Sequence, residues 1–207
     1  MLKISKGLLS IFAIAGVACV ISCGRNEKFI GTWTSTVPDD ITSSVPAASM
    51  ATSLVSVSFM PGVDTKDGGS VALSSVINVN QPVQPGVGLD AAYEVNVAAT
   101  ASVGGTWSYK GDDDDELVLA FDPSTLKVNI DNNGVTFTQN LLTGAQQPQI
   151  DSLTAATAQQ WKAQLTRALT TEFGRFRQLE DVKVHKGDIL TFEIENPDQT
   201  LQFRKAQ

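Results

Sequence analysis

Residues 53–59 read Ser-Leu-Val-Ser-Val-Ser-Phe, and this stretch decides the fold class. Val55, Val57 and Phe59 alternate with small polar residues, so one side of the segment is apolar and the serines are expected on the other. A period of two is typical of a β-strand with one face in the core and one face in water. The stretch therefore predicts a mainly β protein.

The same alternation recurs through the rest of the chain. It is carried by Val71, Leu73, Ile77 and Val79, by Tyr93, Val95 and Val97, by Leu117, Leu119 and Phe121, by Leu126, Val128 and Ile130, by Val182 and Val184, by Leu190, Phe192 and Ile194, and by Leu201 and Phe203. Turn-forming residues such as Asp122-Pro123 and Asn132-Asn133-Gly134 separate several of these segments. We expect an antiparallel barrel or barrel-like sheet of about eight to eleven strands.

One segment has a helical period instead. Between residues 152 and 177, large apolar side chains fall near one stripe, while Gln159 and Lys162 lie away from it. The stripe consists of Leu153, Trp161, Leu165, Leu169, Phe173 and Phe176. Asp151 and Ser152 have side chains that can cap the first turn. The sequence predicts one amphipathic helix packed on the barrel.

The first 22 residues have the composition of a signal peptide. Two lysines precede an apolar run from Leu8 to Ile21 that is short for a bilayer-spanning helix. The segment ends in Val20-Ile21-Ser22-Cys23, which resembles a lipobox, and the resemblance implies that Cys23 carries the lipid anchor. An ordinary secretory signal or a buried thiol at Cys23 is the alternative. We expect residues 23–28 to be a lipidated tether and residues 29–207 to form one domain.

The cysteine count fits an exported lipoprotein. Both cysteines of the chain, Cys19 and Cys23, lie in the signal region, so residues 24–207 hold no disulfide and depend on a packed core. The tether lacks an acidic run resembling the surface-export signals of Bacteroidetes lipoproteins. We therefore expect attachment to the outer membrane of a bacterial cell envelope, with a periplasm-facing position slightly favoured over the surface.

The chain is acidic, with a formal net charge of −7 and a pI of about 4.6. Removal of Lys3 and Lys6 with the signal would make the remainder more negative still. A surface of this charge repels phosphate backbones, so nucleic acid is excluded as an expected partner.

A family resemblance enters at the first predicted strand. Phe29-Ile30-Gly31-Thr32-Trp33 is similar to the Gly-x-Trp signature on the first strand of lipocalins, and its place just after the lipid-anchored cysteine looks like lipocalin-like lipoproteins of Bacteroidetes. The resemblance implies that Gly31 and Trp33 form a structural plug and that Arg204 lies near Trp33. Three strands after the helix and the lack of a second lipocalin motif are departures, so no ligand is implied.

The Gly-Thr-Trp triplet at Gly31 occurs again at Gly105. In both places we expect glycine where two backbones approach closely and tryptophan as a large apolar plug. Trp107 and Tyr109 then follow on one face of a strand, where they either line a ligand pocket or pack in the core.

The densest charge feature is the acidic segment 112–116, read as four aspartates and a glutamate. Asp112, Asp114 and Glu116 are a candidate cation site, because calcium takes several hard oxygen ligands. The spacing of a dedicated calcium loop is missing, and a solvated hairpin tip is the alternative. No cofactor is expected.

Material for catalysis is sparse. His185 is the single histidine, and Glu193 and Glu195 alternate with apolar residues, so they are expected to face solvent and not to serve with Asp188 as a carboxylate pair. We expect no enzyme activity. Ser152, within Asp151-Ser152-Leu153, also resembles the O-glycosylation sequon of exported Bacteroidetes proteins.

These observations favour a monomeric, non-catalytic envelope lipoprotein that binds a small apolar or glycan-like ligand in the barrel. Long segments at Pro38–Met50 and Pro82–Leu89 would either form the rim of the barrel mouth or be solvated linkers. The alternative is a structural or interaction lipoprotein with a filled core that docks an envelope protein.

Overall fold

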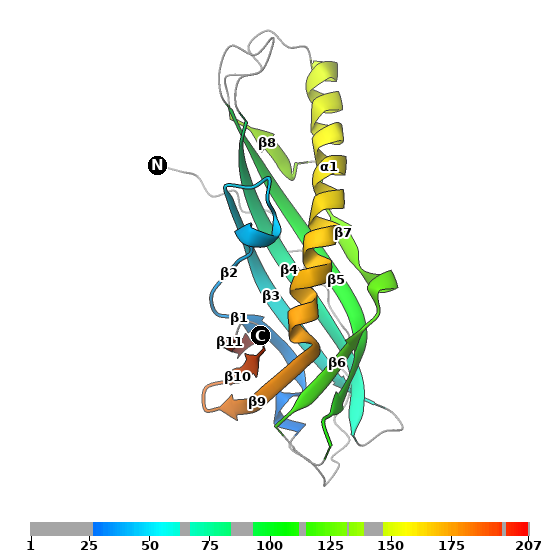
Figure 1. Cartoon of the computed structure of the whole chain (residues 1–207), viewed down its shortest axis with the longest axis vertical. Coiled ribbons are helices and arrows are strands. Elements are labelled where there is room, and N and C mark those ends of the chain that lie inside the picture. The colour runs from blue at the N-terminus through cyan, green and yellow to red at the C-terminus, as the bar shows by residue number, and fades with distance from the viewer. Residues whose placement is uncertain are drawn as a thin grey trace.

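The computed structural model describes residues 27–62, 67–83, 93–111, 115–131, 133–138, 147–195 and 198–206 (Figure 1). The strands are β1 (Gly31–Ser35), β2 (Asp39–Asp40), β3 (Met50–Pro61), β4 (Gly68–Val83), β5 (Tyr93–Tyr109), β6 (Leu117–Phe121), β7 (Lys127–Asn129), β8 (Val135–Phe137), β9 (Gln178–His185), β10 (Ile189–Ile194) and β11 (Gln199–Lys205). The helical elements are α1 (Gln147–Gly174) and four short 3-10 turns, η1 (Glu27–Phe29), η2 (Thr42–Ser44), η3 (Pro123–Thr125) and η5 (Arg175–Arg177).

Eight strands form a closed antiparallel barrel. Each pairs with the next in the order β1, β3, β4, β5, β6, β9, β10 and β11, and β11 returns to β1. The closing pairs place Trp33 opposite Lys205 on one side and opposite Val57 on the other. The prediction of a mainly β, antiparallel barrel with one helix packed against it is confirmed.

The ring closes along only part of the longest strands. β4 has 16 residues and β5 has 17, whereas β6 has five and β10 has six. Beyond β6, the edge of β5 pairs with β7 and then with β8, while β2 pairs with the corresponding part of β3. The helix α1 runs beside these long strands and contacts β7, β8 and η2 (Figure 1). The helix thus covers the part of the sheet that the short strands leave open.

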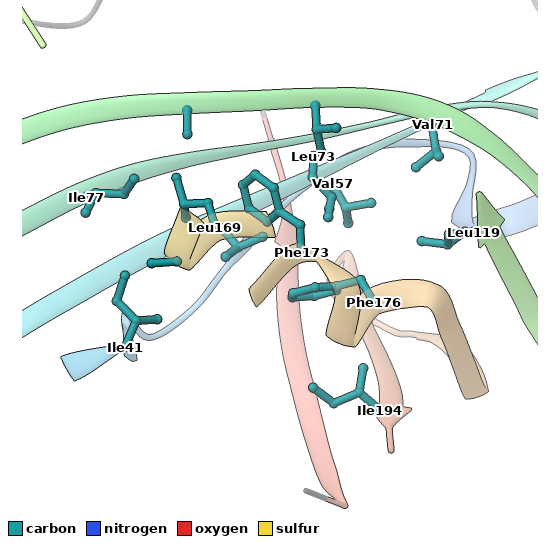
Figure 2. Close-up of a cluster of buried hydrophobic side chains, with 14 of the residues drawn as sticks. Ile41, Val57, Val71, Leu73, Ile77, Leu119, Leu169, Phe173, Phe176 and Ile194 are labelled. Carbon is teal, nitrogen blue, oxygen red and sulfur yellow. The ribbon is translucent and has the colours of Figure 1, made fainter. Parts of the chain in front are cut away.

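The buried stripe of α1 packs against small residues on the inner face of the sheet. Trp161, Leu165 and Leu169 are at most 1% exposed. The sheet presents Ala51, Ser53, Ser75, Ala99 and Ala101, all of them buried. Figure 2 shows Leu169 and Phe173 lying against Ile77, Leu73 and Val57.

Ser53 corrects one detail of the strand prediction. It shares the inward face with Val55, and it is Leu54 that points outward and is half-buried. The Ser53 and Ser75 hydroxyls pair with each other at 2.6 Å, so neither polar group is buried without a partner. The two serines are small side chains on the inner face, and their hydroxyl groups satisfy each other's hydrogen-bonding capacity.

The helix also begins earlier than predicted. It starts at Gln147 instead of near residue 152, and after Gly174 the chain continues through the 3-10 turn η5 to Arg177. Asp151 and Ser152 therefore lie in the second turn, so the expectation that they cap the helix is wrong. Pro148 is the sequence signal for the observed start. The backbone N–H groups of the first helical turn make no intrahelical hydrogen bond, so a proline, which has no N–H, loses nothing there.

Candidate functional site

The candidate site predicted from the sequence is the barrel interior. At the end where the chain enters the barrel, Phe29 of η1 inserts among aromatic side chains. Its ring centroid lies 5.2 Å from Phe59, 5.1 Å from Trp107 and 6.1 Å from Tyr109, all in edge-to-face geometry. The Trp107 Nε1–H donates a 2.9 Å hydrogen bond to the Met60 carbonyl oxygen. These contacts close one end of the barrel.

The two candidate ligand-binding residues are therefore together, but they are enclosed. Trp107 is 3% exposed and Tyr109 is 7% exposed. Their rings lie 5.6 Å apart at nearly a right angle and are covered by Phe29. In this arrangement both side chains contribute to the core, and neither is open to a ligand at this end.

Trp33 is the centre of the plug that the Gly-x-Trp resemblance implied. It is fully buried, and its Nε1–H donates a 2.6 Å hydrogen bond to the Phe29 carbonyl oxygen. The cation near its ring is Lys205, whose Nζ lies 5.5 Å from the ring centroid. Arg204 is instead exposed, opposite Thr34 on the outer face, because neighbouring strand residues point to opposite sides. The implied position of Arg204 near Trp33 is wrong, and the next residue, Lys205, occupies that position instead.

The two glycines of the repeated triplet have different roles. A Cβ on Gly105 would lie 2.3 Å from the Ala120 carbonyl oxygen, so the expected close approach of two backbones is present there. Gly31 has a φ of +133°, a backbone conformation that favours glycine, and a Cβ added there would meet side chains alone, Lys205 Cε at 3.5 Å and Trp33 Nε1 at 4.0 Å. The close-approach explanation is wrong for Gly31, where the backbone angle supplies the reason.

Gly105→Ala is expected to destabilise the barrel by about 1–3 kcal/mol, the usual range for overpacking, since the added methyl group meets backbone that cannot rotate away. Urea unfolding followed by tryptophan fluorescence measures the loss. Gly104→Ala is the matched control, because its nearest neighbour would be the Thr125 hydroxyl at an ordinary 3.6 Å. Equal stabilities of the two variants would contradict the prediction.

The other end of the barrel is filled from α1 and η5. Phe176 lies 6.2 Å from Phe192, which stacks on Phe203 at 4.9 Å. Phe173 and Leu169 continue this cluster along the helix (Figure 2). Two hollows lined by described residues open on the outer surface, one beside Asn80 and one beside Gly174. Buried side chains therefore occupy the interior at both ends of the closed ring.

The predicted rim at 38–50 is a folded cover. It contains β2 and η2, and its Ile41 and Val45 are each 1% exposed. The Ser44 hydroxyl donates to the Glu172 carboxylate and thereby joins this cover to α1. Of the second predicted rim, residues 82 and 83 belong to β4 and residues 84–89 lie outside the described residues.

The Asp40 carboxylate organises the turn within this cover. It accepts hydrogen bonds from the Thr42 hydroxyl at 2.6 Å and from the Thr42 amide at 2.9 Å, and these bonds lower the pKa of Asp40 below its ordinary 3.8. Because the folded-state pKa is lowered, the stabilisation is present above pH 3.8 and is lost as the pH falls through the folded value.

Thr42→Val is therefore expected to raise the pKa of Asp40 back toward its ordinary value, since the largest contribution comes from the hydroxyl. A carbon-detected NMR titration of the side-chain carboxyl groups measures the shift. Asp122, whose pKa is lowered in the same way by Ser124, is an internal control that must not change. An unchanged titration of Asp40 would refute the assignment.

An ion cluster that the sequence analysis missed joins three distant segments. Arg175 Nη1 lies 3.1 Å from an Asp39 oxygen and 2.9 Å from a Glu172 oxygen, and Nη2 donates to the Gln199 side chain at 3.0 Å. The cluster ties the end of α1 to β2 and to the start of β11. Glu172 and Arg175 form a local i,i+3 pair, but no local pattern marks their contacts with Asp39 and Gln199, which are far away in sequence and meet them only in the fold.

Of the three residues predicted to form a cation site, the structure describes Glu116 alone. Glu116 pairs with Lys110 at 2.7 Å, and this bond raises the pKa of Lys110. Asp112 and Asp114 lie outside the described residues. Among the residues that are described, no three histidine, cysteine or acidic side chains gather as metal ligands would.

The remaining candidates are scattered over the surface. His185 is exposed and shares a 2.8 Å hydrogen bond with the Thr191 hydroxyl. Glu193 is exposed, as its strand alternation predicted, and accepts a 3.3 Å hydrogen bond from Thr200. Ser152 is exposed on α1. Cys23 lies outside the described residues.

The fold and its interior together define a closed antiparallel barrel filled by its own side chains and by one helix. The chain matches no family model, no curated protein and no solved structure. Within the described ranges, no helix has both the length and the apolar character needed to cross a membrane.

Proposed function

We propose that this chain is a lipid-anchored, non-catalytic lipoprotein of the bacterial cell envelope that acts by docking a protein partner on its outer surface. The observation that carries the proposal is the filled interior. Phe29 closes one end, and Phe173 and Phe176 close the other, so a ligand of barrel size would have to displace core side chains.

Displacing that core is energetically unfavourable. Burial of a large apolar side chain stabilises a fold by about 1.5–3 kcal/mol, and several such side chains would have to leave together. Binding pockets in proteins are usually largely pre-formed concave spaces. The buried aromatic side chains inside the barrel therefore favour the docking function over the ligand-carrying alternative.

The anchor is proposed from residues 1–23 alone. Two or three acyl chains at Cys23 would hold the protein stably on a membrane, whereas one chain gives only marginal binding. Cys23→Ser is expected to move the protein from the membrane fraction to the soluble fraction and to abolish incorporation of labelled palmitate. Cys19→Ser is the control that should change neither readout, and labelling that persists in Cys23→Ser would refute the anchor.

The filled interior is tested with an apolar fluorescent probe, N-phenyl-1-naphthylamine. The wild-type protein is expected to show no saturable increase in probe fluorescence. Phe173→Ala removes a buried ring from the end of the barrel that α1 and η5 fill. It is expected to create a cavity that binds the probe, because apolar cavities take up apolar ligands. Leu169→Ala is a second cavity variant in case the first fails to fold.

Stoichiometric probe binding to the wild-type protein, weakened by Phe173→Ala, would instead support the ligand-carrying function. The docking proposal would then lose the observation on which it rests. The variants also supply the positive control, since a probe that enters neither cavity variant reports nothing about the wild type.

A further inference from the structure

A hollow of about 340 Å³ lies on the outer surface where α1 ends and β9 begins. Its wall comes from three parts of the chain. Thr171 and Gly174 belong to the last turn of α1, Arg177 belongs to η5, and Glu195 follows β10. Glu195 reaches this place because β10 runs antiparallel to β9 and ends beside the residue with which β9 begins. The hollow is thus assembled by the tertiary fold.

Two opposite charges line this hollow without pairing. Arg177 and Glu195 are both exposed, and within the described part of the chain neither has a hydrogen-bond or ion-pair partner. Lys110 attracts Glu195 through space but does not form an ion pair with it. The charged groups of Arg177 and Glu195 therefore stand apart across the hollow, and each is available to a ligand.

The remaining polar groups of the hollow differ in their hydrogen bonding. Arg175 also lines it, but its guanidinium group is held by the carboxylates of the ion cluster at the end of α1. The Thr171 hydroxyl makes no hydrogen bond to any described residue, whereas the neighbouring Thr170 hydroxyl donates to the Thr166 carbonyl oxygen at 2.8 Å. The hollow thus offers a cation, an anion and a hydroxyl group that the fold itself does not use.

Gly174 leaves room in the wall of the hollow. Its φ is −62°, an ordinary helical angle, and a Cβ added there would have no atom within 4 Å. Neither backbone conformation nor packing requires glycine at this position, although glycine is among the least favourable residues in a helix. The absence of a side chain here enlarges the space between the charged groups.

The two opposite charges favour a ligand that carries both signs. An anion alone would be attracted by Arg177 and repelled by Glu195, and a cation alone would meet the reverse. A molecule with a carboxylate and an ammonium group satisfies both residues, and a carboxylate can accept two parallel N–H bonds from a guanidinium group. The volume is at the small end of ligand sites, which span about 300–1,000 Å³.

We propose that this hollow binds a small zwitterion of the amino-acid or short-peptide type. The ligand carboxylate lies at Arg177, its ammonium group lies at Glu195, and the Thr171 hydroxyl supplies a further hydrogen bond. The inference goes beyond the proposed function, because the site is outside the barrel and does not depend on a protein partner. The core stays in place when the ligand binds, so this site and the filled interior are tested independently.

The test is isothermal titration calorimetry of the full chain, extracted from membranes in detergent. The ligands are alanine, dialanine and trialanine, which hold their two charges at increasing distances, and at least one is expected to bind in a saturable way. N-acetylation or C-terminal amidation of that ligand removes one charge and should weaken binding by about tenfold or more. Lack of saturation by all three at about 10 mM, ten times a millimolar dissociation constant, would overturn the inference. Equal binding of the blocked ligands would overturn it too.

Arg177→Gln and Glu195→Gln are each expected to weaken binding of the zwitterion by about tenfold or more. In Arg177→Gln, amidation of the ligand should no longer matter, and in Glu195→Gln, acetylation should no longer matter. Arg204→Gln and Glu193→Gln are the matched controls, because they make the same exchanges at exposed positions that do not line the hollow. Equal losses in the controls would contradict the assignment.

Gly174→Gln places a side chain in the hollow. It is expected to abolish binding while the thermal unfolding midpoint stays the same or rises, because glutamine is more favourable than glycine in a helix. This variant separates occupation of the hollow from loss of the fold. Undiminished binding to Gly174→Gln would mean that the zwitterion binds elsewhere, and the inference would be wrong.

Discussion

Trp33→Ala is expected to reduce the free energy of unfolding by about 3–5 kcal/mol, the range for deleting a fully buried tryptophan. The large effect has two causes. The ring is fully buried in the barrel core, and its Nε1–H donates a hydrogen bond to the Phe29 carbonyl oxygen, which positions the turn that closes one end. Urea unfolding at constant protein concentration measures the loss.

Trp33→Phe separates these two causes. Phenylalanine keeps most of the apolar volume but leaves the Phe29 carbonyl without its donor, so a loss of about 1–3 kcal/mol is expected. If Trp33→Ala cost less than about 1 kcal/mol, the barrel core could not be organised around this residue as described.

Trp161→Ala is the second substitution with a large expected effect. Among the α1 side chains that the structure describes, Trp161 is the first that is fully buried, and it lies in the same core as the long strands. We expect a loss of about 3–5 kcal/mol from the cavity it leaves. The loss should be uneven, since amide hydrogen exchange should accelerate in α1 before it accelerates in β1 and β11.

Leu153→Ala is the control on the same helix. Leu153 is 40% exposed, so its replacement should cost no more than about 0.5 kcal/mol. Uniform acceleration of exchange throughout the molecule in Trp161→Ala would show that the helix and the barrel unfold as one unit, contrary to the expected order.

The strands were predictable because their signal is local. Val55, Val57 and Phe59 alternate over a few residues, and the same period marks the segments that become β4, β5 and β10. Whether the sheet closes into a ring could not be predicted, because closure depends on the pairing of β11 with β1, two segments at opposite ends of the domain. The helical stripe identified α1 as well, although the cap-like pair Asp151-Ser152 misplaced its start.

Two features of the fold could not be predicted from local patterns, because they depend on contacts between segments that are distant in sequence. A serine among alternating residues reads as a surface residue, yet Ser53 faces the core because Ser75 of the neighbouring strand completes its hydrogen bond. The Arg175 cluster likewise brings together β2, α1 and β11. The contacts between segments leave no pattern in any one of them, although Glu172 and Arg175 are a local i,i+3 pair.

The sequence predicted that Trp107 and Tyr109 lie together, but it could not show whether they are open to a ligand or enclosed in the core. Trp107 and Tyr109 were expected to be neighbours, and they are. Their enclosure depends on Phe29, which precedes the first strand and returns to cover them. Whether an aromatic pair lines a pocket or fills a core is decided by such third residues.

The pairing of β11 with β1 has a consequence for how the chain folds. Trp33 and Lys205 are about 170 positions apart, and contacts of such sequence separation form slowly because a long loop must first be closed. The β3–β4–β5 hairpins need only local contacts. The barrel therefore cannot close until nearly the whole chain has been synthesised, and until that moment the edge of β1 is unpaired and open to association with other unfinished chains.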